Sequence, residues 1–339
     1  MADPVSILLV ATPHVSASSL FGLYDTLMAA GRDWDFLVSG KEGAAVFDVK
    51  LVGPHLEPFA SASGFRISPD VTFEDDVDCD IVIVPGLQLS THERLDPADH
   101  PAIEWLKVRR DAGTRIVSAC TGAIYLAEIG LLDGVEVTTH WGFEDLFRRH
   151  YPSVRLRLDR GLCFADASSG VATSGGTTGW QELALFLIAN YGSVQLASRA
   201  AKVWLLADRG ELQAPYSSMI KASPHDDAIV AEAQSWIGEH YALENPVAEM
   251  TNRSGLPPTS FARRFRKATG KSPMDYVQSV RIEEARQMLE TTEMPVAEIG
   301  DEVGYTDTAT FRRLFKRRTG LTPAEHRNLF GAPRFDRYI

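Results

Sequence analysis

A cysteine occupies a tight turn between a predicted strand and a predicted helix. The apolar run 115–119 is typical of a buried strand, and a helical pattern covers residues 123–129. Cys120, Thr121 and Gly122 therefore form a strand-to-helix turn built from small residues. Because a helix N-terminus carries partial positive charge, this position favours the thiolate form of Cys120. The turn is a candidate site for nucleophilic chemistry or ligand binding.

A histidine and a glycine follow two other predicted strands. His140 comes directly after the run 136–139, and Gly86 lies just beyond the run 80–84. Since the carboxyl ends of parallel strands face one edge of a sheet, we expect His140 and Cys120 to approach each other at that edge. Gly86 would present a backbone N–H there. Together these groups predict a small polar site.

Three interpretations of the Cys120–His140 pair stay open. The favoured one is a ligand pocket without turnover; the others are a redox-sensitive or residually catalytic thiol, and a packed cysteine beside a core histidine. Residues 174–178 lead into a helix predicted from 179, so their N–H groups are candidates for binding an anionic ligand group. The candidate ligand-binding residues are Gly86, Cys120, Thr121, His140, Ser174 and Gly175.

The elements that would position this site alternate along roughly the first 205 residues. Predicted strands cover 6–11, 35–39, 80–84, 115–119, 136–139, 162–165 and 170–173. Predicted helices cover 19–30, 98–112, 123–129, 142–150, 179–190 and 193–206. Runs such as 81–84 are apolar throughout, which is typical of strands buried on both faces. The alternation predicts an α/β domain with a mostly parallel sheet, a flavodoxin-like sandwich.

The last hundred residues contain an internal repeat. Residues 246–273 and 295–323 match in order, first at an offset of 49 and, after one inserted residue, at an offset of 50. Each copy predicts a helix, a turn near a glycine and a second, basic helix. In the second helices the spacing of Phe261 with Phe265, and of Phe311 with Phe315, places each pair on one inward face. Two ordered copies indicate one supersecondary unit used twice.

The basic residues of the repeat suit a DNA-binding helix–turn–helix. The segment 253–271 holds six Lys and Arg without an acid, and five of the seven residues 312–318 are basic. A short basic helix fits the DNA major groove, where outward side chains contact base edges and flanking cations bind phosphates. A helix predicted from Ser272 to about Glu290 would join the two units. We therefore predict an all-α C-terminal domain with two helix–turn–helix units.

Composition and charge limit the other classes. The chain has 339 residues, 45% hydrophobic and 23% charged, which is typical of a globular protein of two or three domains. Its net charge is −11. Residues 1–223 carry −10 of this, with 18 Lys and Arg against 28 Asp and Glu, and residues 224–339 carry −1, with 16 against 17. The chain has three cysteines and no metal-ligand motif, which predicts a protein without metal or cofactor. It has no secretory signal and no apolar run of membrane length, so we expect it to be cytoplasmic. Cys79 and Cys163 are interpreted as structural.

The segment from about 228 to 330 resembles the DNA-binding domain of AraC/XylS-type transcription regulators. It has both helix–turn–helix units, the joining helix and the paired Thr-Gly-x-Ser/Thr-Pro ends. The resemblance implies double-stranded DNA as a partner and assigns base contacts and phosphate contacts to separate sets. The implied base contacts are Thr259, Ala262 and Arg263 in the first unit, with Thr308, Arg312 and Arg313 in the second. Phosphate contacts are expected from Arg266, Lys267, Lys316 and Arg317.

Residues 5–205 resemble the PfpI-like branch of the class I glutamine amidotransferase superfamily. The resemblance rests on the cysteine turn and on the stretch from Ala119 to Trp141. Both domains together are similar to the GlxA-type regulators. Hydrolytic relatives often carry His where this chain has Thr121, and several carry Glu in the region where this chain has no carboxylate before Asp25. An orienting acid is therefore missing from the expected triad.

These observations predict a DNA-binding transcription regulator. Its domains would be a sensor at 1–209, a linker at 210–227 and the DNA-binding domain at 228–330. The resemblance implies a small-molecule effector, with a nitrogen-containing metabolite suggested, and a homodimer. The alternative function is a cysteine-dependent hydrolase or hydratase with an accessory DNA-binding tail. We expect no enzymatic activity, since the triad is incomplete.

Overall fold

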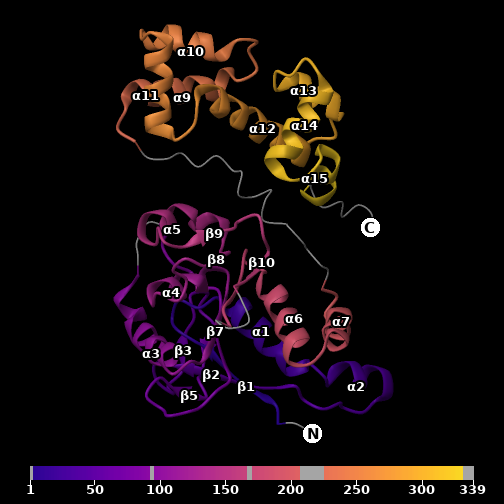
Figure 1. Cartoon of the computed structure of the whole chain (residues 1–339). Helices are drawn as coiled ribbons and strands as arrows, with labels where there is room; N and C mark the ends of the chain where they lie inside the picture. Colours follow the sequence, from indigo (N-terminus) through magenta and orange to yellow (C-terminus); the bar gives the residue numbers. More distant parts are fainter. Residues whose placement is uncertain (1–2, 92–94, 166–169, 207–224, 331–339) are drawn as a thin grey trace. The chain divides into compact units, whose positions relative to one another are not determined.

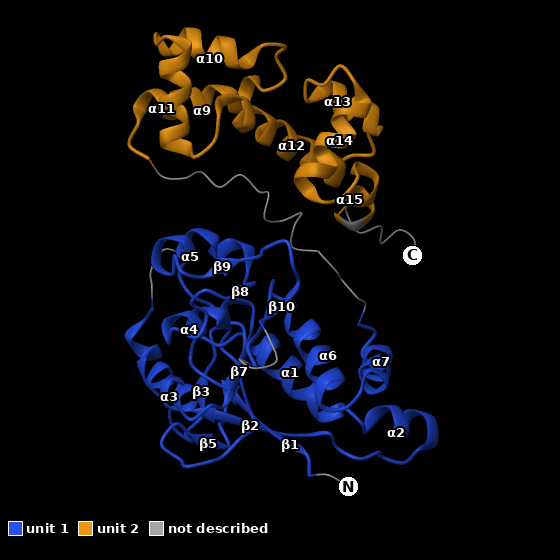
Figure 2. Cartoon of the chain, in the orientation of Figure 1, with its two compact units in different colours: residues 1–213 blue, residues 214–339 orange. Residues whose placement is uncertain are grey.

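The chain divides into two compact units, residues 1–213 and 214–339 (Figure 2). The computed structural model describes residues 3–91, 95–165, 170–206 and 225–330. The predicted linker at 210–227 lies outside the described residues except for its last three. We refer to the two units as the N-terminal and C-terminal domains. Each is described by itself.

A seven-stranded sheet forms the centre of the N-terminal domain. Its strand order is β10-β11-β7-β6-β1-β2-β5, and every neighbouring pair is parallel except β10 with β11. The five strands β2, β1, β6, β7 and β11 reproduce the 2-1-3-4-5 order of a flavodoxin-like fold, which confirms the predicted fold class. The bounds are β1 Val5–Val10, β2 Phe47–Gly53, β5 Val71–Thr72, β6 Ile81–Val84, β7 Arg115–Ala119, β10 Leu162–Phe164 and β11 Ala172–Ser174.

Helices cover both faces of this sheet. Figure 1 shows α1 and α6 on one side and α3 and α4 on the other. Apolar residues of the strands, such as Leu9, Val82 and Ile83, are fully buried between these layers. The helices are α1 Ala17–Ala29, α2 Asp33–Ser39, α3 His100–Asp111, α4 Ala123–Glu128, α5 Glu144–His150, α6 Trp180–Tyr191 and α7 Val194–Val203. Two small sheets, β3 (Phe59–Ala60) with β4 (Arg66–Ile67) and β8 (Glu136–Val137) with β9 (Arg155–Leu156), lie outside the main sheet.

Two strand predictions were wrong. The run 35–39 belongs to helix α2, because Asp33 and Asp35 favour the first turn of a helix and Gly40, with φ of 71°, ends it. Residues 136–139 do not join the main sheet; only the first two form a strand, which pairs with β9. Strand β2 was not predicted, although its first four residues alternate between buried and exposed as in a half-buried strand; its last three residues are all buried.

The C-terminal domain contains seven helices among its described residues, 225–330. They are α9 Ala228–His240, α10 Pro246–Ser254, α11 Pro258–Thr269, α12 Pro273–Thr291, α13 Val296–Glu302, α14 Thr308–Thr319 and α15 Pro323–Phe330. Two separate hydrophobic clusters hold them together. The first subdomain comprises α9, α10, α11 and the N-terminal half of α12; the second comprises the rest of α12 with α13, α14 and α15. The prediction of two helix–turn–helix units on one joining helix is confirmed.

Local signals define the ends of these helices. Ser272 accepts a hydrogen bond from the Asp275 N–H at the start of α12, and Asp307 accepts from Ala309 and Thr310 at the start of α14. At the other ends, Gly270 and Gly320 adopt left-handed backbone conformations with φ of 72° and 80°. The second helix of each unit, α11 and α14, therefore ends at the same kind of glycine cap, whereas α14 begins at a side-chain cap and α11 begins after Pro257 without one.

Candidate functional site

The reading helix of the first subdomain, α11, is anchored by phenylalanine and exposes its cations. Phe261 and Phe265 are fully buried, with ring centroids 5.6 Å apart. Thr259, Arg263, Arg266 and Lys267 are exposed and Ala262 is half-buried. The helix thus turns its apolar face inward and its cations toward solvent.

The reading helix of the second subdomain, α14, repeats this arrangement. Phe311 and Phe315 are fully buried with centroids 5.7 Å apart. Four cations are exposed: Arg312, Arg313, Lys316 and Arg317. Thr308 is half-buried as the first residue of the helix. In the register of the repeat Arg313 matches Arg263, whereas Thr308 matches Pro258 and Thr259 matches Ala309. The two predicted threonine contacts therefore occupy different positions on the two helices.

Two further arginines of these helices bond to residues of the same domain, although the side chain of Arg264 is still 45% exposed. Arg264 Nε donates to Asp227 Oδ2 at 2.7 Å, which ties α11 to the residue that caps α9. Arg318 donates to Ser279 Oγ and Gln278 Oε1 on α12, at 3.1 and 3.0 Å. These two arginines bond the reading helices to other parts of the domain. The sequence alone did not distinguish them from the other cations of these helices.

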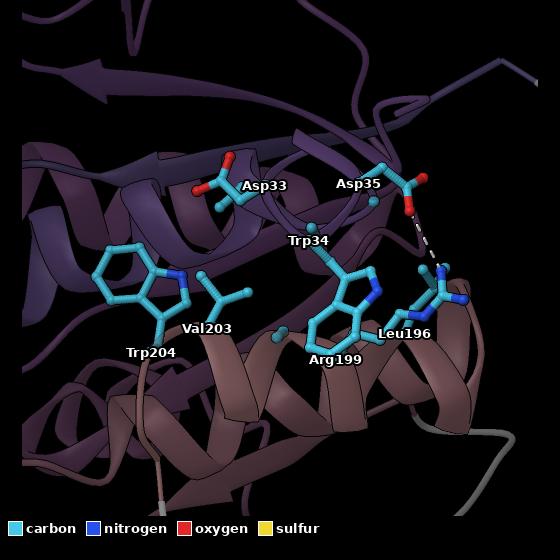
Figure 3. A pocket seen from close by; sticks show the side chains of 11 residues that line it. Asp33, Trp34, Asp35, Leu196, Arg199, Val203 and Trp204 are labelled. Atoms are coloured by element: carbon cyan, nitrogen blue, oxygen red, sulfur yellow. Dashed lines mark ion pairs between the residues drawn. The ribbon is translucent and has the colours of Figure 1, made fainter. Parts of the chain in front are cut away.

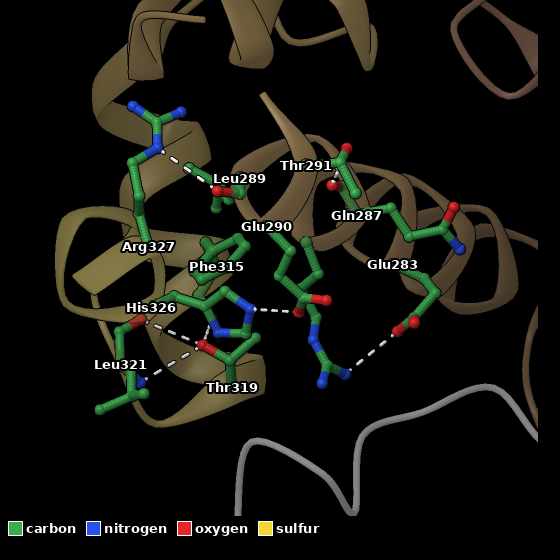
Figure 4. Close-up of polar contacts among 11 residues, drawn as sticks. Glu283, Gln287, Leu289, Glu290, Thr291, Phe315, Thr319, Leu321, His326 and Arg327 are labelled. Carbon is green, nitrogen blue, oxygen red and sulfur yellow. Dashed lines mark hydrogen bonds and ion pairs between the residues drawn. The ribbon is translucent and has the colours of Figure 1, made fainter. Parts of the chain in front are cut away.

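Contacts between α12, α14 and α15 hold the second reading helix in place (Figure 4). The buried His326 on α15 lies 2.8 Å from Glu290 on α12 and stacks edge-on against Phe315. Burial lowers the pKa of His326, so the neutral imidazole is favoured. Thr319 Oγ1 donates back to the Phe315 carbonyl at 2.9 Å. The basic surface of α14 is thus mounted on a packed support.

The cysteine turn lies beside the topological switch point of the N-terminal sheet. The chain leaves β1 toward β2 and leaves β6 in the opposite direction, toward β7. Ligands of open α/β sheets bind where this reversal occurs, outside the carboxyl ends of the strands. Residues 11–15, 85–88 and 120–122 follow β1, β6 and β7, so they meet at this edge. The predicted site residues Gly86, Cys120 and Thr121 belong to these segments.

Cys120 has a strained backbone that its neighbours enforce. Its φ is +54°, a left-handed value that is costly for a residue with a side chain. The Cys120 carbonyl accepts the Thr139 hydroxyl at 2.9 Å. A Cβ at Gly122 would lie 2.4 Å from the Val84 carbonyl, so only glycine allows β6 to pack this closely. These contacts with the surrounding chain hold Cys120 in its left-handed conformation.

Burial reverses the predicted ionisation of Cys120. The residue is only 6% exposed, and desolvation raises its pKa to about 11, against smaller opposing hydrogen bonds from Thr121. The expectation that the helix N-terminus favours the thiolate is therefore wrong for this structure. Loss of hydration in the apolar environment destabilises the thiolate more than the N-terminus of the short helix stabilises it. At neutral pH the side chain is a thiol.

The polar groups expected around Cys120 already have protein partners. Gly86 N–H donates to Ser19 Oγ at 2.9 Å, and the Thr121 hydroxyl bonds both the N–H and the carbonyl of Leu87 at 2.6 and 2.5 Å. Gly175 N–H donates to the Gly161 carbonyl at 2.8 Å. These groups shape the turn in this structure, and a ligand would have to replace their bonds in order to use them.

The two remaining predicted site residues, His140 and Ser174, have surroundings that differ from each other. His140 caps the next helical turn, since its Nδ1 accepts the Gly142 N–H at 3.0 Å, and its ring stacks on Trp141. Ser174 pairs with Ala119 in neighbouring strands, which brings it alongside the cysteine turn. Its hydroxyl is buried and has no hydrogen-bond partner among the described residues. Ser174 is therefore the predicted residue with an unused polar atom near Cys120.

A histidine–aspartate–tyrosine group at the same edge was missed by the sequence analysis. His14 Nδ1 lies 2.8 Å from Asp99 Oδ1, and the Tyr125 hydroxyl donates to the same oxygen. Asp99 is fully buried, and its second oxygen has no partner among the described residues. The His14 side chain is 27% exposed. The three residues are far apart in the sequence, so no motif marks them.

This group connects directly to the cysteine turn. Gln88 N–H donates to the His14 carbonyl at 2.8 Å, and the preceding residue, Leu87, is bonded to Thr121. Tyr125 lies on α4, one turn beyond Thr121. A partly exposed imidazole oriented by a buried carboxylate is thereby held at the switch point, as many binding and catalytic histidines are.

A separate cleft lies between α2 and α7 (Figure 3). It encloses about 290 Å³, including the part open to solvent, and is lined by residues that include Trp34, Asp35, Arg199 and Trp204. Arg199 lies 3.6 Å from Asp35, and the cations of Arg199 and Lys202 lie within 5.8 Å of the Trp34 ring centroid. This chain's own cations therefore already contact the Trp34 ring of the cleft.

Among the described residues no helix has the length and apolar character needed to cross a bilayer. The same part of the chain contains no cluster of three or more His, Cys, Asp or Glu arranged to hold a metal ion.

A doubled basic helix–turn–helix joined to a flavodoxin-like α/β domain defines a DNA-binding transcription regulator. Comparison with known families supports both halves: residues 250–329 match the helix-turn-helix domain family and residues 5–190 match the DJ-1/PfpI family. The chain belongs to the DJ-1/PfpI family and carries an AraC-type DNA-binding domain. This confirms the predicted resemblance and the predicted function as a regulator.

Two regulators align with more of this chain than its N-terminal domain, and one enzyme aligns with a smaller part. The HTH-type transcriptional regulator Rv1931c of Mycobacterium tuberculosis is 30% identical over 261 residues, covering 74% of this chain and 95% of that protein. The HTH-type transcriptional regulator GlxA of Rhizobium meliloti is 25% identical over 294 residues, covering 86% of this chain and 88% of that protein. An enzyme, isonitrile hydratase of Pseudomonas putida, is 31% identical over 138 residues, covering 40% and 51%.

Proposed function

We propose that this regulator binds a small metabolite at the switch point of its N-terminal domain and controls transcription through its C-terminal domain. The observation that carries the proposal is the buried Asp99, which orients the partly exposed His14 beside the cysteine turn. The site comprises the predicted ligand-binding residues together with His14. Ser174 adds an unpartnered hydroxyl alongside them.

The DNA contacts of the proposal follow the exposed side chains of the reading helices. Arg263 and Arg313 contact bases at matched positions, aided by Thr259, Ala262, Thr308 and Arg312. Arg266, Lys267, Lys316 and Arg317 bind phosphates, since they lie near the ends of the helices and remain exposed. Two chains acting as a homodimer in the cytoplasm would present four reading helices. The effector would act by binding two arrangements of the dimer unequally.

We further propose that the N-terminal domain is not an enzyme. Burial raises the pKa of Cys120 to about 11, so the nucleophilic thiolate is disfavoured at pH 7. Ser19 accepts from Gly86 in the region where catalytic relatives would supply a carboxylate. Hydrolase or hydratase activity is the second candidate function, and the likeness to an isonitrile hydratase over part of the chain is the observation that favours it.

The proposed effector site is tested by ligand screening of the full chain. A metabolite panel is assayed by thermal shift on the natural protein and on His14→Asn, Cys120→Ser and Arg199→Gln. A true effector should raise the unfolding midpoint of the natural protein more than that of His14→Asn. We expect His14→Asn to bind the effector about tenfold more weakly, because one charge-assisted hydrogen bond is lost. Arg199→Gln, in the separate cleft, is the control and should bind normally.

Two results would contradict the proposal. An effector whose binding is lost only in Arg199→Gln would move the site to the cleft between α2 and α7. Turnover of an amide or an isonitrile by the natural protein, abolished in Cys120→Ser, would establish the enzymatic alternative. Transcriptional control that survives in Cys120→Ser, with no turnover, would support a binding role.

A further inference from the structure

The two reading subdomains have distinct hydrophobic cores along one helix, and the partly buried Tyr241 packs against both cores. Val277 and Val280 of α12 belong to the first hydrophobic cluster, whereas Ile282, Ala285 and Leu289 belong to the second. The boundary between the clusters therefore falls at residue 281. With separate cores on either side, the orientation of one reading helix relative to the other depends on α12 and on the contacts made at this boundary.

Arg281 occupies the boundary and bonds to both subdomains. Its Nε and Nη2 donate to the carbonyls of Tyr241 and Leu243, both at 2.7 Å, in the connection that follows α9. Its Nη1 donates to the Gly304 carbonyl at 2.8 Å, in the turn between α13 and α14. The planar guanidinium thus fixes three carbonyls from two subdomains in one arrangement.

Two further contacts tighten the same boundary. The guanidinium lies 5.3 Å from the centroid of the Tyr305 ring, in the second subdomain. A Cβ at Gly304 would lie 2.6 Å from the Ala242 carbonyl and 2.9 Å from Arg281 Nη2. The corresponding Gly255 of the first subdomain has no atom within 4 Å of such a Cβ. The turn of the second subdomain is therefore pressed against the first, and the glycine permits it.

We propose that Arg281 is a specificity-determining residue, because its bonds to both subdomains fix the number of base pairs between the two sequences that α11 and α14 contact. Base pairs along DNA are rotated as well as translated relative to one another, so a rotation of one subdomain about α12 would bring its side chains to different base edges. Arg281 itself contacts no DNA in this proposal; it acts as a positioning residue for Arg263 and Arg313. The inference rests on the DNA interface proposed above.

The test is a selection of binding sites from a randomised DNA duplex library, carried out with the full chain. The natural protein should enrich two short motifs at one fixed spacing. Arg281→Met, which leaves three carbonyls without their donor, should retain both motifs but spread them over at least two spacings. It should also lose about tenfold in affinity for the natural spacing, comparable to one good base contact. Arg281→Lys, with a compact ammonium in place of the fork, should fall between them.

Arg327→Met is the matched control. Arg327 also donates to two carbonyls, those of Leu289 and Met294, but both belong to the second subdomain. This substitution should lower thermal stability and leave the spacing unchanged. A merely structural role of Arg281 predicts the same result for Arg281→Met.

The outcomes separate this inference from the DNA-binding proposal. If the natural protein enriches no motif, the proposed DNA interface fails. If the natural protein, Arg281→Met and Arg281→Lys all enrich one and the same spacing, the role of Arg281 is refuted. If Arg281→Met does not fold, Arg281→Lys is tested instead. Its affinity and that of the natural protein are measured for short duplexes whose spacing differs from the natural one by one base pair. Equal discrimination by Arg281→Lys and the natural protein would overturn the proposal.

Discussion

At the scale of single residues, neighbouring arginines on one helix have different tasks. Arg263 is exposed on the reading helix α11, whereas the next residue, Arg264, bonds to Asp227. Sequence indicates the basic character of the helix but treats these cations alike. Their partners depend on which face of α11 packs against α9, and that is a property of the folded domain.

We predict that Arg263→Ala lowers the affinity for the best DNA site by about 1–3 kcal/mol and relaxes the preference at one base pair. The reason is the loss of a side chain that contacts a base edge. Binding of the natural and variant proteins to a set of single-base operator changes measures both effects. Arg264→Ala is the control and should leave the base preference intact. Equal weakening of every DNA sequence by Arg263→Ala would show a phosphate contact instead.

At the scale of elements, the repeat predicted both reading helices and their buried phenylalanines. Both helices could be predicted because apolar spacing and the glycine that ends each helix are local signals. The strand predicted at 35–39 failed because a short apolar run is compatible with a helix or a strand. In α2 three of its apolar residues, Phe36, Leu37 and Val38, are more than half exposed.

The repeated turns allow a comparison of two matched glycines. Gly255 and Gly304 both have positive φ, of 64° and 86°. We expect Gly255→Ala to lower the free energy of unfolding of its subdomain by about 1 kcal/mol, the cost of the left-handed region. Gly304→Ala should cost about 3 kcal/mol, because a clash with the Ala242 carbonyl adds to it. Hydrogen exchange of α10 and α13 amides in the full chain measures each effect. Equal costs would contradict the close packing of the two subdomains.

At the scale of the whole molecule, the net charge of −11 conceals a DNA-binding protein. The acidic excess belongs to the N-terminal domain, while the exposed cations of α11 and α14 form the surface that would meet DNA. Because salt screens interactions beyond about 8–10 Å, the local charges decide DNA affinity more than the net charge does.

We predict that DNA affinity falls steeply with salt. Four phosphate contacts per chain, from Arg266, Lys267, Lys316 and Arg317, imply a slope of log K against log salt of about −3.6. A dimer bound through both chains should give about −7. Titrations of a labelled operator between low and moderate salt measure this slope, and sedimentation of the complex counts the chains. A slope near zero would exclude a phosphate-contacting surface on these helices.

The sequence alone determined the class of this protein, since periodicity, capping residues and an internal repeat can be recognised from the order of residues along the chain. It also located the cysteine turn, because a strand-to-helix change is a local event. Only the tertiary structure decided the properties that depend on distant groups. Burial raises the pKa of Cys120, Asp99 orients His14 from 85 residues away, and Arg281 joins two subdomains. Desolvation and contacts between distant segments arise when the chain packs, so sequence spacing could not predict them.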